Sequence, residues 1–503
     1  MSVSLAGISN WEVLTGKSLG SDHYVLLCSV GGRGEVIVGN GIQKWVYSKA
    51  DWGIFKLVSE EVMVSVVTSG DIDTVNNSVT SAIIAAASKS IPRSKNRRDR
   101  KLVPWWTEEC SKAVKARNKA FRKVKREHNT QSLVEYQRAQ ALVKTVTKRT
   151  QRVSWRQFRG KIGRTTPVGE VWGMIRKMGG DRREWEYPVI TLEEQTAICD
   201  KDKADLMAKS FAKVHSVDQL TVEERRRREV TLSNYPDVLV RRVDTREKID
   251  DGGTMAELVR AIKKAKPSAP GGDQVSYVML KHLRERGMEN LLELYNRVWV
   301  EGKLPSVWKE AVVIPIRKPG KDPGKPSSYR PIALTSNICK IMERLVTERL
   351  TYELEKKGLL TSCQSGFRKG RHTMDAVVRL ENEIRKAQAN KESVVVVFFD
   401  IEKAYDMMWR EGLLIKLYKM GVGGRVFNWI KNFLFDRKIQ VWIGSELSNK
   451  YMVGNGTPQG SVISPLLFII MINDVFSKVP EDIGSVCRRW GFVEKGKKCD
   501  AYY

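Results

Sequence analysis

The sequence predicts an α+β fold, and three observations support this class. Residues 394–399 read Val-Val-Val-Val-Phe-Phe, a β-branched and aromatic run that predicts a strand ending at Asp400. From Met255 onward, short runs of this kind alternate with turns and with amphipathic helical patterns. Between Glu108 and about Ile162, apolar residues recur at three- and four-residue steps, which predicts helices. A helical region followed by a region in which short strands and helices are mixed is typical of α+β proteins.

Composition limits the partners that the chain can have. Its 503 residues allow two to four domains, and 87 Lys and Arg against 58 Asp and Glu give a formal charge of +29. This excess favours a polyanionic partner, with nucleic acid ahead of an anionic membrane. No membrane attachment is expected, because the longest apolar stretch, residues 462–472, is short and contains Ser464-Pro465. No signal peptide is expected, and seven scattered cysteines without zinc-ligand spacing indicate a reducing compartment.

The N-terminal half reads as a strand remnant followed by helices. Residues 20–27 look like the last strand of another domain, and a helix is expected through Phe55 and Val58. The basic helices of residues 108–162 have two interpretations, a solvated face or an arm that contacts phosphates, because their charge is mostly of one sign. Residues 225–228, four arginines flanked by glutamates, favour a locally salt-bridged helix.

The strand that ends at Asp400 is apolar on both faces, which predicts a buried strand that delivers this carboxylate to a sheet edge. A cation could bind there. The alternative is a core strand whose terminal Asp is solvated. A helix-forming pattern follows directly, and Asp406 within it could be a helix N-terminal carboxylate.

Two cationic residues flank a Pro- and Gly-rich turn between predicted strands. Lys318 and Arg330 could hold a triphosphate and stabilise charge during phosphoryl transfer, although such pairs are also common surface residues.

Two Gly-containing turns could meet a nucleic acid. The basic loop of residues 364–371 would let a backbone approach while Phe367 stacks, or it is a plain surface turn. The turn of residues 456–460 places Gln459 before a helix through Leu467, Ile470 and Met471. This glutamine could hydrogen-bond a nucleotide or a template strand, or the turn only leads into the helix.

Together these segments resemble, in order, the reverse transcriptase of non-LTR (LINE-type, jockey-like) retrotransposons. The resemblance rests on residues 269–271 (Ala-Pro-Gly), 329–332 (Tyr-Arg-Pro-Ile), 364–368, 399–406 and 458–461, and it is strongest from about Lys266 to Asp474. Residues 20–23 (Gly-Ser-Asp-His) resemble the closing motif of the family's endonuclease, and residues 105–110 resemble its connecting region.

The resemblance implies an RNA-directed DNA polymerase with right-hand fingers and an antiparallel palm sheet backed by helices. Asp400 and the backbone carbonyl of Ile401 would bind Mg²⁺, with two ions in an intact enzyme. Lys318 and Arg330 would meet the triphosphate, Tyr405 would lie under the sugar, and Gln459 would contact the nucleotide. The implied template and primer contacts are Gly366, Phe367, Arg368 and Gly460. The implied endonuclease residues, vestigial here, are Asp22 and His23, with His23 as the former general base.

The resemblance also implies partners and domains. The partners would be an RNA template, a DNA primer, target DNA and deoxynucleoside triphosphates, with residence in nucleus and cytoplasm; no oligomeric state is indicated. Residues 1–28 would be the endonuclease remnant, 29–253 a basic, largely helical connector, 254–484 incomplete fingers and palm, and 485–503 an out-of-frame tail.

One expected motif is missing. The family carries Phe-Ala-Asp-Asp in a hairpin after the helix that ends near Asp474, where this chain reads Ser-Val-Cys-Arg-Arg-Trp-Gly-Phe-Val over residues 485–493. One back-translation of this segment, read one nucleotide later, encodes Phe-Ala-Asp-Asp-Gly-Ala-Leu, so we hypothesise a frameshift; an Arg488 codon other than AGA or CGA would disprove it. Without the paired Asp, and with no thumb expected, the chain is predicted to polymerise little, and the palm is predicted to have an unpaired edge. The alternative is an inert RNA-binding remnant.

Overall fold

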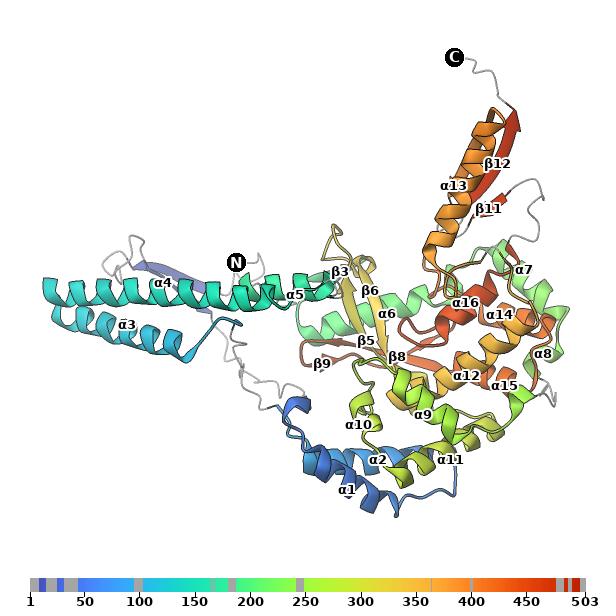
Figure 1. The fold of residues 1–503 in the computed structure, drawn as a ribbon, viewed down its shortest axis with the longest axis horizontal. Coiled ribbons are helices and arrows are strands. Elements are labelled where there is room, and N and C mark those ends of the chain that lie inside the picture. Colours follow the sequence, from blue (N-terminus) through green and yellow to red (C-terminus); the bar gives the residue numbers. More distant parts are fainter. Residues whose placement is uncertain are drawn as a thin grey trace. The chain divides into compact units, whose positions relative to one another are not determined.

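The computed structural model describes most of the chain (Figure 1). The described residues are 9–14, 25–30, 44–94, 103–163, 166, 168–179, 187–240, 248–362, 364–398, 401–475, 484–486 and 491–497. The chain divides into two compact units, residues 1–44 and residues 45–503. In the first unit, β1 (Ser9–Leu14) and β2 (Val25–Val30) form an antiparallel pair.

A helical core unites segments that lie far apart in the sequence. It is built from helices whose apolar faces meet, namely α1 (Trp52–Met63), α2 (Ile72–Ser90), α9 (Met255–Lys264), α10 (Tyr277–Lys281), α11 (Glu285–Glu301), α12 (Asn337–Lys356), α14 (Arg410–Lys419), α15 (Gly424–Leu434) and α16 (Ser464–Met471). Phe55, Leu294 and Trp429 are fully buried in it. Residues 45–91 of the expected connector therefore share one core with the region after residue 254.

Local sequence explains where these helices begin. Asp71 caps α2 by accepting a hydrogen bond from the Thr74 amide, and Thr254 and Glu257 form a reciprocal capping box at α9. The helix predicted through Leu467, Ile470 and Met471 is confirmed as α16. The helix predicted through Phe55 and Val58 is confirmed as α1.

A mixed sheet lies beside this core. Its strands run in the order β10 (Tyr451–Val453), β8 (Arg437–Ile443), β5 (Glu310–Arg317) and β6 (Tyr329–Leu334), and the short β9 (Glu446–Leu447) pairs with β8. The β5–β8 pair is parallel and the others are antiparallel, so this sheet is mixed. Helix α6 (Asp200–Val214) packs on it and completes a second apolar cluster that includes Phe211 and Val441.

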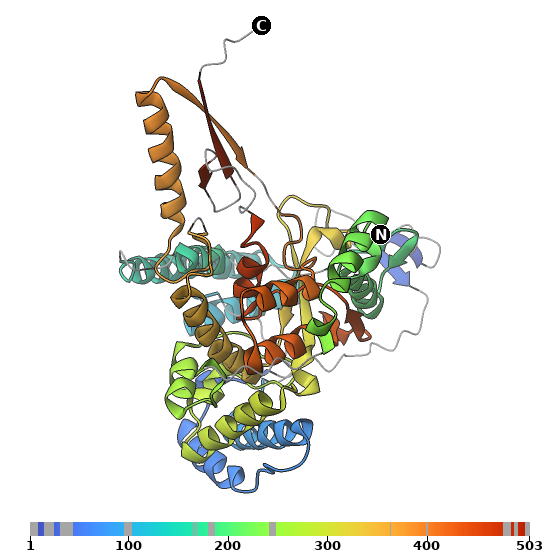
Figure 2. The same ribbon diagram turned by 90° about the vertical axis from the view of Figure 1, so that its right-hand side faces the viewer.

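The strand that precedes Asp400 lies in a different, three-stranded sheet. β7 (Glu392–Phe398) pairs antiparallel with β12 (Gly491–Lys497), which pairs with β11 (Gly484–Val486). Figure 2 shows α13 (Thr373–Ala389), an orange helix, beside these strands, and it packs on all three. Val395 is 56% exposed, so the prediction of a strand buried on both faces is wrong. The reason is that a sheet covered by one helix leaves alternate side chains exposed.

The same sheet changes the expectation of an unpaired edge. Residues 491–497, which the sequence analysis assigns to the out-of-frame tail, occupy one edge of β7. In the described part of the chain no strand lies along its other edge. β7 is thus an edge strand, but one with a partner.

The predicted basic helices form a two-helix hairpin. α3 (Glu108–Glu127) and α4 (Thr130–Arg159) pack against each other (Figure 1), and His128, with a positive φ of 49°, ends the first helix. The remaining elements are short, namely α5 (Val168–Gly179), the β3–β4 pair (Ile190–Leu192, Gln195–Ala197), α7 (Val222–Ser233) and α8 (Asp237–Val240). Among the helices that the structure describes, none is long and apolar enough to span a bilayer.

Candidate active site

The β5–β6 hairpin carries the two predicted triphosphate-binding cations. Ile316 pairs with Arg330, and the hairpin continues because the Lys318 amide donates to the Ser328 carbonyl at 2.8 Å. The Lys318 ammonium donates to the Ser327 carbonyl at 2.9 Å, and Arg330 is exposed. Directly paired residues of a hairpin share a face, so Lys318 and Arg330 lie at the same end of the hairpin and on one side of it.

The turn that bears Gln459 is tied to two other predicted segments. The Gly456 amide donates to the Met408 carbonyl and the Thr457 amide donates to the Tyr405 carbonyl, both at 2.8 Å. The Gln459 carbonyl accepts from the Ala333 amide on β6, also at 2.8 Å. The turn therefore bridges the segment that follows Asp400 and the strand that carries Arg330.

Glycine is required where this turn is closest to its neighbours. Gly456 has φ +77°, and a Cβ there would lie 2.4 Å from the Asp406 carbonyl oxygen and 2.5 Å from that of Tyr405. Gly460 has φ +127°, and its Cβ would lie 2.7 Å from the Ala333 carbonyl oxygen. Both positions exclude larger residues by contact as well as by backbone conformation.

A buried glutamate fixes the helix that follows the turn. Glu343 of α12 is fully buried and accepts from the Val462 and Ile463 amides and from the Ser461 hydroxyl, at the N-terminal end of α16. A carboxylate there satisfies amides that lack helical partners and interacts favourably with the helix dipole. The helix entry is thereby anchored to α12.

A buried arginine holds the start of the same turn. The Arg410 guanidinium donates to the carbonyls of Val453, Asn455 and Gly456 at 2.8–2.9 Å and is 2% exposed. Burial, and to a lesser extent the neighbouring Arg437, lower the pKa of Arg410 to about 9. All three contacts fix backbone carbonyls, so Arg410 determines the path of the chain toward Gln459.

His215 reaches the site from the end of α6. Its Nε2 lies 3.7 Å from Oδ1 of Asp406, its Nδ1 lies 3.1 Å from the Asn455 carbonyl oxygen, and its own carbonyl accepts from the Asn455 amide at 2.7 Å. Burial lowers the pKa of His215 and raises the pKa of Asp406, while their mutual attraction opposes both shifts. The positive charge of Lys318 also opposes the rise in the pKa of Asp406. The expected connector thus supplies a side chain to this region.

Asp406 differs from one interpretation of the sequence. It lies in a turn, where its amide and that of Met407 donate to the Lys403 carbonyl at 2.9 Å, and α14 begins later, at Arg410. The interpretation of Asp406 as a helix N-terminal carboxylate is therefore wrong, as is the helix expected directly after Asp400. Lys403, with φ +50°, interrupts the helical pattern.

Tyr405 lies at the edge of the same cluster. Its ring centre is 5.4 Å from that of Phe468 on α16, and partial burial raises the pKa of its hydroxyl. Four of the predicted nucleotide-site residues therefore come from segments that contact one another, namely Lys318, Arg330, Tyr405 and Gln459.

The loop of residues 364–371 is arranged differently from the prediction. Arg368 forms a two-point ion pair with Glu355 and donates to the Thr361 and Gln364 carbonyls, so its side chain is 7% exposed. These contacts stabilise the loop and leave Arg368 poorly placed for a template. Phe367, with φ +57°, is 66% exposed, and the adjacent Gly366 has room for close approach.

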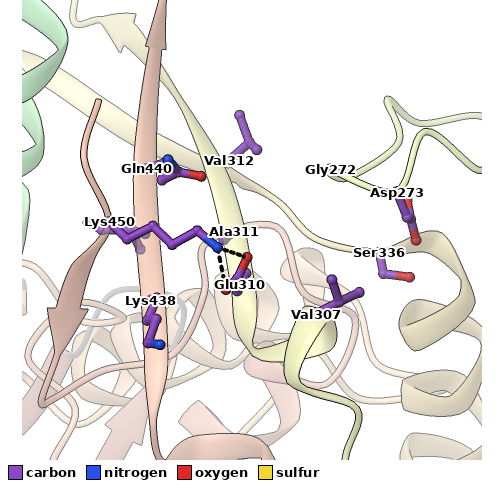
Figure 3. A pocket seen from close by; sticks show the side chains of 11 residues that line it. Gly272, Asp273, Val307, Glu310, Ala311, Val312, Ser336, Lys438, Gln440 and Lys450 are labelled. Carbon is purple, nitrogen blue, oxygen red and sulfur yellow. Dashed lines mark hydrogen bonds and ion pairs between the residues drawn. The ribbon is translucent and has the colours of Figure 1, made fainter. Parts of the chain in front are cut away.

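The Ala-Pro-Gly segment packs against the start of α12. A Cβ on Gly271 would lie 2.7 Å from the Ser336 amide nitrogen, and Asn337 donates to the Val275 carbonyl at 2.8 Å. Figure 3 shows the small pocket beside this loop, where the Lys450 ammonium lies 2.7 Å from both carboxylate oxygens of Glu310. This partly exposed ion pair joins the start of β5 to the residue before β10, and the loop acts as a packing element.

Three predicted residues, Asp400, Asp22 and His23, lie outside the described residues. Ile401 is described, and its side chain is 41% exposed. In the described part of the chain no group of three His, Cys, Asp or Glu side chains could hold a metal ion. Asp406, a partly buried acid that follows Asp400, is paired with His215. The described His, Cys, Asp and Glu side chains therefore do not make up a two-metal site.

Sequence reasoning missed His215 and Arg410. Both act through contacts with residues that are distant in sequence, so no local spacing identifies them. The available signal for His215 was rarity, because the chain contains five histidines and this one directly follows the α6 helix.

Comparisons with known proteins find reverse transcriptase relatives for this part of the chain. Residues 316–499 match the family model for "Reverse transcriptase (RNA-dependent DNA polymerase)". The chain is 36% identical over 220 residues to "Probable RNA-directed DNA polymerase from transposon BS" and 32% identical over 228 residues to "RNA-directed DNA polymerase from mobile element jockey", both of Drosophila melanogaster. These alignments cover 44% and 45% of this chain but 24% and 25% of those relatives. A protein of the type-1 retrotransposable element R1DM, also of Drosophila melanogaster, is 24% identical over 464 residues, covering 87% of this chain and 41% of that protein.

Proposed function

We propose that residues 316–499, which match the reverse transcriptase family model, form a reverse transcriptase domain of the kind found in non-LTR, LINE-type retrotransposons, and that the chain binds an RNA template, a DNA primer and a deoxynucleoside triphosphate. The reaction is RNA-directed addition of nucleotides to a DNA 3′ end. The chain spans about a quarter of the length of the first two relatives, so the substrates and partners are our proposal.

One observation carries this proposal, the bridging position of the Gln459 turn. Its hydrogen bonds to Tyr405 and Ala333 connect the residues proposed to read the sugar and the base with the strand proposed to hold the triphosphate. A nucleotide has these three parts, and a polymerase must hold them together. A solvated turn leading into a helix needs neither contact.

The proposed roles follow from the chemistry of each group. Arg330 and Lys318 neutralise the triphosphate, because a guanidinium and an ammonium on a rigid hairpin bind phosphate oxygens strongly. The half-buried Tyr405 ring limits the space at the sugar 2′ position. Gln459 offers a donor and an acceptor to the base pair, and Phe367 stacks on the template strand, with Gly366 and Gly460 allowing close approach of its backbone.

Reverse transcriptases generally use divalent metal ions, and we propose Mg²⁺ here with Asp400 and the Ile401 carbonyl as ligands. Mg²⁺ prefers oxygen ligands, and the ion would supply charge stabilisation to the transferring phosphate. No paired Asp follows Asp474 in the sequence, since Asp482 and Asp500 are single. We therefore propose that this chain binds its substrates but extends a primer slowly, at roughly a thousandth of an intact enzyme's rate or less.

We also propose an origin for the two ends of the chain, a DNA partner and a location in the cell. Residues 1–28 would derive from an endonuclease-like domain that includes Asp22 and His23, and residues 485–503 would be read out of frame. Target DNA would be a further partner, with residence in nucleus and cytoplasm. An inert RNA-binding role is the second candidate.

The test measures nucleotide binding separately from catalysis. The whole chain is mixed with a DNA primer annealed to an RNA template, and dNTP binding is titrated for the unmodified chain, Arg330→Ala, Gln459→Ala and the control Arg317→Ala. Arg317 pairs with Tyr329 and so faces the opposite side of the hairpin from Arg330. We expect a loss of about tenfold or more for the first two variants, or about 1.4 kcal/mol, and less than twofold for the control. Equal affinity in all four proteins would refute the proposed site.

A further inference from the structure

The α3–α4 hairpin carries a large part of the positive charge of the chain. Residues 108–159 contain 15 Lys and Arg against 4 Glu. Each glutamate is paired with a different cation, in the pairs Glu108–Lys112, Glu109–Arg149, Glu127–Arg126 and Glu135–Lys123. All four glutamates of the hairpin are therefore ion-paired. Among the described residues, most lysines and arginines of the hairpin have no acidic partner.

Five of these cations follow one face of α3, and we call them the α3 ridge. They recur at steps of three and four residues and are all exposed, namely Lys112, Lys115, Lys119, Arg122 and Arg126. At 3.6 residues per turn they fall within an arc of about 80° and extend for about 21 Å. The ridge is therefore a continuous line of positive charge.

The opposite face of α3 makes the hairpin seam. Cys110 and Ala113 are buried there, and the Cys110 thiol lies 3.4 Å from the Thr150 hydroxyl of α4. Since α4 covers that face, the ridge points away from its partner helix. In the described part of the chain Lys115, Lys119 and Arg122 have no acidic partner. Like charges at such spacing destabilise a helix, and a polyanion would relieve that repulsion.

We propose that the α3 ridge is a docking surface for the phosphate backbone of an RNA strand, outside the nucleotide site. The ridge is made of cations alone and offers no base-reading groups, so the contact is independent of sequence. The choice of RNA rests on the proposed function, because the template is the long polyanion that the domain must retain. The ridge would hold template away from the site where it is copied.

The test uses the whole chain and a 30-nucleotide RNA of low structure, with binding measured by fluorescence anisotropy from 50 to 300 mM salt. The ridge variant is Lys115→Gln, Lys119→Gln and Arg122→Gln, since glutamine keeps the helix. The control is Arg225→Gln, Arg226→Gln and Arg227→Gln on α7, an exposed arginine run with the same charge change. Circular dichroism shows that each protein is folded.

The ridge variant should bind RNA on the order of a hundredfold more weakly at 0.1 M salt and lower the log–log salt slope by about 2, from three contacts at about 0.7 each. The control should change affinity less than twofold. Equal losses in both variants would show a net-charge effect and overturn the proposal, and so would tighter binding to DNA of equal length or to anionic vesicles. Nucleotide binding by the ridge variant should be unchanged, so a failure of the ridge and a failure of the nucleotide site give different results.

Discussion

Replacing Gly456 by alanine should disturb the turn that carries Gln459. A non-glycine residue in the left-handed region costs about 1–2 kcal/mol. The added Cβ would lie 2.4 Å and 2.5 Å from two carbonyl oxygens, so the backbone must move by roughly one ångström to reach an ordinary contact. That movement weakens the hydrogen bonds from Gly456 to Met408 and from Thr457 to Tyr405, at about 0.5–1.5 kcal/mol each. The expected total is about 2–5 kcal/mol.

Gly370 offers a matched control. It has a similar positive φ of +73°, but a Cβ there meets nothing within 4 Å, so Gly370→Ala should cost only the backbone term. Urea unfolding of both variants gives the difference, which we expect to be about 1–3 kcal/mol. Gly456→Ala should also lose dNTP affinity while Gly370→Ala retains it. Two variants that unfold within about 0.5 kcal/mol of each other, with equal nucleotide affinity, would refute this reasoning.

Three further predictions concern side chains around the site and core. Arg410→Met removes three hydrogen bonds to backbone carbonyls and should cost about 3 kcal/mol in urea unfolding, with a cost below about 1 kcal/mol contradicting the role of Arg410 in the turn. Partial burial raises the pKa of Glu257, but hydrogen bonds from Arg349 and the Thr254 amide outweigh it and lower the pKa to about 2. A lowered carboxyl pKa stabilises the fold above about pH 4.5, and this contribution is lost as the pH falls toward 2. The free energy of unfolding of Glu257→Gln should therefore fall less between pH 4.5 and pH 2 than that of the unmodified chain. An unchanged pH profile would contradict this. Tyr405→Val should reduce the binding preference for dATP over ATP by about tenfold in competition titrations, and an unchanged preference would exclude Tyr405 from the sugar site.

Periodic segments were predictable because their signals are local. Ala113 and Val124 recur at helical steps, and that pattern is sufficient for α3, as the apolar spacing around Leu467 is for α16. The gathering of Arg330, Tyr405 and Gln459 could be expected only from the ordered resemblance to a family.

Long-range contacts were not predictable from one sequence. The burial of β7 was overestimated because a Val run does not reveal that α13 is the helix that packs on the sheet. The helix expected after Asp400 begins later because Lys403 adopts a positive φ, which no residue pattern indicated. His215 and Arg410 act on backbone groups that lie 43 to 240 residues away, a distance at which spacing carries no information.

We propose above all that residues 316–499 keep a nucleotide site but carry no paired Asp at residues 485–493, where the second acidic motif is expected. The most direct measurement is primer extension on an RNA template with Mg²⁺, for the unmodified chain and for Asp400→Asn at equal primer–template occupancy. We predict that the unmodified chain extends the primer at less than about 0.01 s⁻¹, a thousandfold under the ~10 s⁻¹ typical of enzymes. The Asp400→Asn variant should lose this residual extension. Extension near 10 s⁻¹, or extension that is indifferent to Asp400→Asn, would contradict these predictions.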